Sequence, residues 1–267
     1  MRTRMLWYKA WLDTRLRFLI GLGVLALATA GCVLAYPRAM QVFAAVGNSD
    51  EAITAIVGSS PVARENIALT LQLAGTYQGF VWSQLFHNEL PQLWCLFAIV
   101  IGSGGIVSQA SRGEGLFSLS LPVSRQQLVM SRAGVALAEL LALAVVPALL
   151  LPLLSPAVQQ SYSATDAIVH GLFLFGGGTV FFSAAFLLSS IFESFWVPPL
   201  VMLAIAGVLT FVRAINPALA RYSVAPILSA EGHFRGTGLP WLGLLVMLAI
   251  STGFLVLAMR NIARRDF

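Results

Sequence analysis

Six apolar runs of about 20 residues each constrain this chain more than any other feature of its sequence. An α-helix of that length crosses roughly 30 Å of hydrocarbon, and backbone polar groups in lipid must be satisfied within the segment itself. We therefore predict an all-α, polytopic membrane protein that forms a single domain over residues 1–267. The six predicted transmembrane helices are Phe18–Tyr36, Pro91–Val107, Ala133–Leu154, Ala167–Ser190, Phe195–Val212 and Leu239–Met259.

Composition excludes an ordinary water-soluble domain. Hydrophobic residues make up 58% of the chain and charged residues only 10%, whereas a soluble domain carries about 25% charged residues. We attribute the net charge of +5 to basic residues that follow the positive-inside rule and contact anionic lipid headgroups. No basic stripe interleaved with aromatic residues is present, so we expect no nucleic-acid partner.

The distribution of Lys and Arg predicts the orientation. With both termini in the cytoplasm, eleven of the 16 basic residues fall in cytoplasmic segments and five in outer ones. Cytoplasmic loops carry the excess of positive charge in multi-pass proteins. The expected topology therefore has both termini inside.

Two regions beside the first span have helical patterns of their own. Residues 1–17 are predicted to form an amphipathic helix in the membrane interface, although a simple continuation of the first span remains the alternative. Residues 37–90 are predicted to form a helical outer loop, because Ser60 and Pro61 make a typical helix start. The apolar side of the N-terminal helix comprises Met5, Tyr8, Leu12 and Leu16, and its charged side Lys9, Asp13 and Arg17.

The connection between the second and third spans, residues 108–132, contains a clear helix start. Ser124 and Gln127 form a capping box, in which each side chain can satisfy a free backbone N–H of the first turn. We therefore predict a helix that begins at Arg125 and continues into the third span, whereas Pro122 ends whatever precedes it.

Residues 111–120 of this connection form a short cytoplasmic element that is partly apolar. Its side chains and the neighbouring Leu121 would be costly to expose to water. We expect them to dock against the membrane domain or against a cytoplasmic partner.

At this point the sequence resembles a known family. The string Ser-Leu-Pro-Val-Ser-Arg at 120–125, placed between the second and third of six spans, is similar to the permease subunits of type-2 ABC exporters. The resemblance covers nearly the whole chain. It departs from the family at Gln109 and Glu114, where family members often carry an acidic residue and a threonine.

The resemblance implies a function. It implies a permease of the bacterial cytoplasmic (inner) membrane, in which two identical or homologous subunits form the substrate pathway of an exporter. It also implies that the connection presses into a groove of a separate ABC ATP-binding subunit. The residues implied in this coupling are Arg112, Gly113, Glu114, Phe117, Leu121, Pro122, Ser124 and Arg125.

Polar residues inside the predicted spans are candidates for the substrate pathway. Glu139 lies about two turns into the third span, where an ionised carboxylate costs several kcal/mol unless it is paired or hydrated. It either lines the pathway or pairs with a neighbouring helix, and the sequence leaves both interpretations open. Ser103 and Gly104 on the second span are the other pathway candidates.

Catalytic chemistry is not expected in this chain. Ser103 and His170 would lie at depths that differ by more than about 10 Å, so they cannot act as a catalytic pair. The sequence has no phosphate-binding loop, so ATP hydrolysis is expected in a partner chain, and no cofactor is expected. A secondary transporter or channel without an ATPase is the alternative function, although no internal repeat supports it.

The two cysteines, Cys32 and Cys95, have no metal-ligand spacing. Two thiols are favoured over a disulfide, and no metal site is expected.

Overall fold

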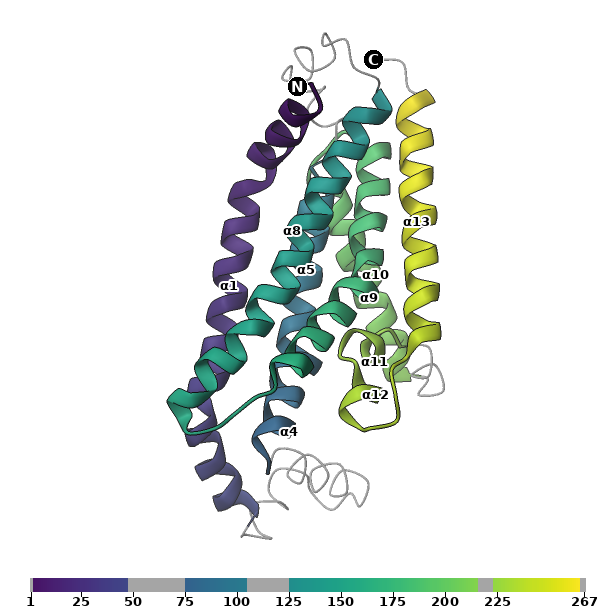
Figure 1. Ribbon diagram of the computed structural model, residues 1–267. Helices are drawn as coiled ribbons and strands as arrows, with labels where there is room; N and C mark the ends of the chain where they lie inside the picture. Colours follow the sequence, from purple (N-terminus) through teal and green to yellow (C-terminus); the bar gives the residue numbers. More distant parts are fainter. Residues whose placement is uncertain (1, 48–74, 105–124, 216–222, 265–267) are drawn as a thin grey trace.

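The computed structural model describes residues 2–47, 75–104, 125–215 and 223–264. Within these ranges all regular secondary structure is helical, and the long helices lie side by side in an elongated bundle (Figure 1). The elements are α1 (Arg2–Gly47), α4 (Tyr77–Val81), the π-helix η1 (Trp82–Glu89), α5 (Leu90–Gly102), α8 (Arg125–Leu154), the 3₁₀-helix η2 (Ser155–Val158), α9 (Ala164–Ile191), α10 (Val197–Ile215), α11 (Ala225–Leu228), α12 (Glu231–Phe234) and α13 (Trp241–Arg264).

Five helical runs are long and apolar enough to cross a membrane, which indicates a multi-pass membrane protein. The sixth predicted span is not confirmed, because α10 contains only a shorter apolar stretch, Val197–Val208, among the described residues. The five runs are Met5–Ala44, Tyr77–Gly102, Gln126–Val158, Ala164–Ile191 and Trp241–Arg264.

The N-terminal residues do not form a separate helix in the structure. They belong to α1, which runs without a break from Arg2 to Gly47, so an interfacial helix distinct from the first span is not confirmed. Of the predicted apolar side, Met5, Tyr8 and Leu16 are exposed. Of the predicted charged side, Asp13 and Arg17 contact α8 and α5. The residues of this segment that are buried against the bundle are Leu6 and Ala10.

The second span begins earlier than the sequence predicts. Thr76 caps α4 by accepting a hydrogen bond from the Gly79 N–H, and the helix then continues through η1 into α5. Helical structure continues into the predicted outer loop, residues 37–90, from both sides, and the position of that loop relative to a membrane stays a prediction. Residues 37–47 extend α1 and residues 77–90 belong to the second membrane helix, so only residues 48–74 of that loop lie outside the described residues.

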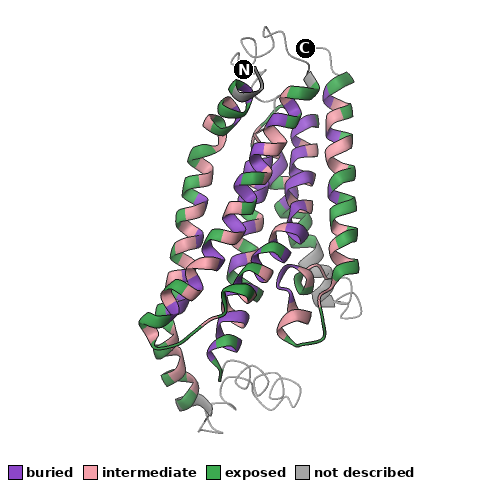
Figure 2. Cartoon of the chain, in the orientation of Figure 1, coloured by how far each residue is buried: buried purple, intermediate pink, exposed green. Residues whose placement is uncertain are grey.

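Helix α9 lies at the centre of the bundle and packs against α5, α8 and α13. Figure 2 shows that its surface is largely buried, whereas the outward sides of α1 and α13 are exposed. Glycines permit the close contacts. The Trp94 ring of α5 lies directly over Gly178, and its indole N–H donates to the Leu140 carbonyl of α8 at 3.1 Å. At Gly171 an added Cβ would lie 3.0 Å from the Ala144 carbonyl oxygen.

The Gly178 contact yields a stability prediction. Gly178→Ala would place a methyl group where the Trp94 ring now lies, and overpacking of a tight core costs about 1–3 kcal/mol. We expect a lower midpoint of thermal unfolding for this variant in detergent. Gly253→Ala on α13 is the matched control, because a Cβ there meets no atom within 4 Å. Equal stability of the two variants would contradict the packing argument.

Candidate functional site

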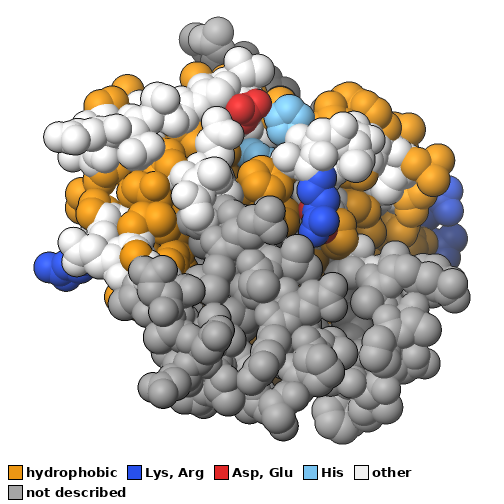
Figure 3. Space-filling model, turned by 90° about the horizontal axis from the view of Figure 1, so that it is seen from below, with side chains coloured by type: hydrophobic (Ala, Val, Ile, Leu, Met, Phe, Trp, Pro, Cys, Tyr) orange, Lys and Arg blue, Asp and Glu red, His pale blue; other side chains and the backbone are white. Residues whose placement is uncertain are grey.

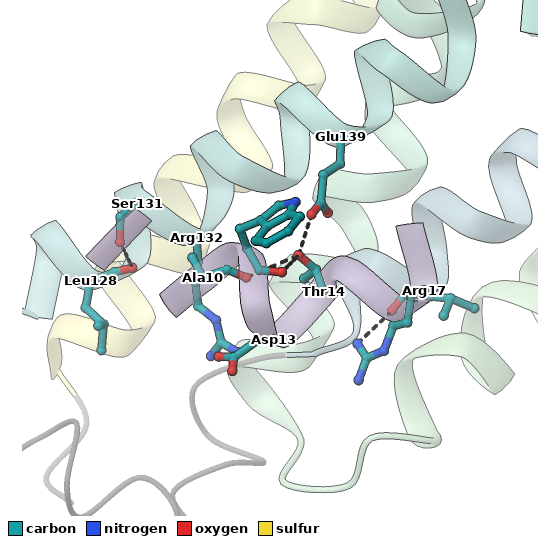
Figure 4. Close-up of polar contacts among 10 residues, drawn as sticks. Ala10, Asp13, Thr14, Arg17, Leu128, Ser131, Arg132 and Glu139 are labelled. Carbon is teal, nitrogen blue, oxygen red and sulfur yellow. Dashed lines mark hydrogen bonds and ion pairs between the residues drawn. The ribbon is translucent and has the colours of Figure 1, made fainter. Parts of the chain in front are cut away.

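A polar cluster joins the first turns of α1 to the beginning of α8 and the end of α5 (Figure 4). It lies at the end of the bundle where α1 begins and α13 ends (Figure 1). Its charged members are Asp13, Arg17, Arg132 and Glu139. Charges this close to apolar helices are expected to find partners, because an unpaired charge is expensive in lipid.

Glu139 is held by α1. Its carboxylate oxygen Oε1 lies 2.6 Å from the hydroxyl of Thr14, which donates to it. The Glu139 side chain is buried, and its second oxygen, Oε2, has no hydrogen-bond partner among the described residues. The contact gives direct support to the interpretation of Glu139 as a group that pairs with a neighbouring helix.

Arg17 connects α1 to two other parts of the chain. Its Nη1 atom donates to the Val100 carbonyl of α5 at 3.4 Å. Its guanidinium carbon lies 4.6 Å from the ring centroid of Phe195, which is a favourable cation–π distance. A Cβ at Gly104 would lie only 2.6 Å from Arg17 Nη1. Gly104 thus leaves room for the guanidinium group.

A second pair of contacts holds α1 against α8. Arg132 Nη2 lies 3.3 Å from Asp13 Oδ2, and the Arg132 side chain is only 11% exposed. The Trp7 ring packs over Gly134, where an added Cβ would lie 2.7 Å from its Cη2 atom. Together with the Thr14–Glu139 bond, these contacts attach two turns of α8 to the start of α1.

The structure brings two of the three pathway candidates against one turn of α1. Glu139 bonds to Thr14, and Gly104 contacts Arg17. Ser103 is buried, and its hydroxyl donates to the Ile99 carbonyl of its own helix at 2.6 Å. A role for these residues in a pathway remains a prediction.

Most of the predicted coupling residues lie outside the described residues. These are Arg112, Gly113, Glu114, Phe117, Leu121, Pro122 and Ser124. Arg125 is the first described residue of α8, so the predicted helix start at this position stays a prediction.

The opposite end of the bundle contains a second group of polar and aromatic side chains, which the sequence did not reveal. His233 Nε2 lies 3.0 Å from Asp166 Oδ1, and the buried His170 ring stacks on Phe86 at 4.4 Å between centroids. Figure 3 looks onto this end, where acidic and histidine side chains adjoin. Burial raises the pKa of the Tyr162 phenol, and the nearby Asp166 carboxylate adds to the rise.

Among the residues that the structure describes, no group of three or more His, Cys, Asp or Glu side chains could hold a metal ion. Cys32 and Cys95 are both free thiols. Glu139 could be predicted from the sequence but Thr14 could not, because a threonine in an amphipathic helix has no signal that identifies a distant partner.

Comparisons with known protein families, with curated proteins and with solved structures gave no match to this chain.

The Thr14–Glu139 bond yields the next prediction. Thr14→Val removes the donor and leaves a buried carboxylate without its partner, which costs about 1–3 kcal/mol. We expect thermal unfolding in detergent to shift to lower temperature. In a Glu139→Leu background, the same Thr14→Val change should have little further effect, because the carboxylate is absent.

Thr252→Val on α13 is the control, since the Thr252 hydroxyl bonds only the Leu248 carbonyl of its own helix. Additive effects of Thr14→Val and Glu139→Leu would show that the two side chains are not coupled.

Proposed function

We propose that this chain is the transmembrane subunit of an ATP-driven exporter of the bacterial cytoplasmic membrane. It pairs with an identical or homologous permease subunit to form the substrate pathway and binds a separate ABC ATP-binding subunit. The observation that carries the proposal is the Leu-Pro-Val-Ser-Arg string at 121–125, which leads directly into α8.

The arrangement of the described helices supports this function. The start of α8, the start of α1 and the end of α13 all lie at one end of the bundle (Figure 1). Arg132 and Glu139, in the first turns of α8, are attached to α1 through Asp13 and Thr14. A partner that pushes on residues 111–125 would therefore displace α8 and α1 together.

Copurification tests the proposal. The tagged chain, extracted from its native membrane, is expected to bring down a P-loop ATPase. The double charge reversal of Glu114→Lys with Arg125→Glu is expected to abolish that recovery, because both residues belong to the proposed contact. ATP hydrolysis by the reconstituted complex should then fall to the level of the ATPase alone.

The matched control is the exchange Glu231→Lys with Arg235→Glu. It also reverses two charges but preserves their ion pair, which measures 2.7 Å in the structure. This pair belongs to the opposite end of the bundle, so the ATPase should still be recovered. Recovery of the permease alone, with transport that needs no ATP, would instead favour the secondary transporter.

The proposed orientation is testable separately. In a variant without Cys32 and Cys95, a single cysteine at position 112 should react with a membrane-impermeant maleimide only in inside-out vesicles. A single cysteine at position 235 should react only in right-side-out vesicles. The opposite pattern would place both termini outside the cytoplasm.

A further inference from the structure

A groove of about 420 Å³ lies between the second half of α1 and the helix formed by α4 and η1. Its walls include Ala28, Gly31 and Phe43 from α1 and Phe80 from α4. Two polar side chains of η1, Gln84 and Glu89, complete the lining. The volume falls within the range of small-molecule sites in proteins.

The part of the groove lined by Cys32 and Glu89 lies within the candidate membrane spans. About 31 Å of α-helix separates Arg17 from Arg38 on α1, which matches the thickness of a hydrocarbon core. Cys32 lines the groove together with Glu89, and it lies about 9 Å of helix inside the level of Arg38. Glu89 therefore belongs to the candidate span Tyr77–Gly102, and its side chain is exposed on the surface of the described residues.

Glu89 has no compensating partner among the described residues: none of their hydrogen bonds or ion pairs involves its carboxylate. Its neighbours in the groove are apolar apart from Gln84 and the Cys32 thiol. An ionised carboxylate facing lipid carries a large solvation penalty, which a cation in direct contact with it relieves. A neutral or zwitterionic lipid cannot supply an uncompensated positive charge.

We propose that this groove binds a cationic amphiphile, a molecule with one ammonium group and one alkyl chain. The ammonium group pairs with Glu89, and the chain lies along the small side chains of α1. The rings of Phe43 and Phe80, with centroids 6.4 Å apart, lie towards the other end of the groove and provide apolar surface for the alkyl chain. The proposal does not depend on coupling to an ATPase.

Photolabelling tests the site directly. The full chain is reconstituted into phosphatidylcholine nanodiscs and exposed to hexadecyltrimethylammonium that carries a diazirine on its chain. We expect saturable labelling of peptides from residues 28–43 and 80–89, with competition by unlabelled hexadecyltrimethylammonium. The matched neutral probe, hexadecanol with the same diazirine, should label these peptides about tenfold less.

Two variants and one control distinguish the contribution of the Glu89 charge from that of the open volume of the groove. Glu89→Gln keeps the volume but removes the charge, and should weaken saturable labelling by about tenfold or more. Gly31→Leu should block the groove without disturbing the fold, because a Cβ at Gly31 meets no atom within 4 Å. Gly23→Leu on the same helix has the same free space but does not line the groove, so its labelling should equal that of the wild type.

Other results would overturn the proposal. Equal labelling by the neutral probe, or undiminished labelling of Glu89→Gln, would show an ordinary lipid-facing surface. An unlabelled groove, with Ala35→Cys forming a disulfide between two copies of the chain, would identify the occupant as a second copy.

Discussion

The fold depends on the close approach of neighbouring helices to α9. In lipid there is no hydrophobic force that drives one apolar helix against another, so association relies on van der Waals packing and hydrogen bonds between helices. Gly178 and Gly171 provide this contact by admitting the Trp94 ring and the Ala144 carbonyl. The Trp94 indole then bonds to α8, so one side chain ties α5 to two neighbours. The remaining helices take their positions from this centre.

Helix α1 is attached to the bundle by different chemistry at its two ends. Near its start the attachments are polar: Asp13 pairs with Arg132 and Thr14 bonds to Glu139. Towards its end they are aromatic, since the Tyr36 ring meets that of Tyr77 edge-on at 4.9 Å between centroids. This distribution follows from the length of the helix, which at about 69 Å greatly exceeds a hydrocarbon core. Only the central part of α1 can be wholly apolar.

Local signals in the sequence predicted local features well. The N-cap before Tyr77 shows how local such signals are, because the Thr76 side chain accepts from the Gly79 N–H within one turn. Apolar runs correctly located four of the described membrane helices, and the fifth, Tyr77–Gly102, was found only in part. Its early turns were missed because residues 83–89 are polar on average, so a test for hydrophobic runs excludes them.

Features that depend on how helices cross could not be predicted. Glu139 was recognised as costly, but its bond to Thr14 exists only because α1 crosses α8 at that level. The continuity of α1 was equally invisible, since a charged amphipathic stretch beside an apolar run is compatible with an interfacial helix or with one long helix. Glu89 was assigned to an outer loop because nothing in its sequence neighbourhood indicated that η1 continues into α5.

The polar cluster also restricts which helices can move in the proposed exporter. Residues 105–124 connect the end of α5 to the start of α8, and both anchors touch α1 through Arg17 and Asp13. Moving α1 against α8 would break charged hydrogen bonds worth about 1.5–3 kcal/mol each, so force on the connection moves these helices as one body. Helix α10 is different, because it packs mainly on α9 and α5. Arg17 also contacts Phe195, just before α10, so a displacement of α1 would reach this loosely packed helix directly.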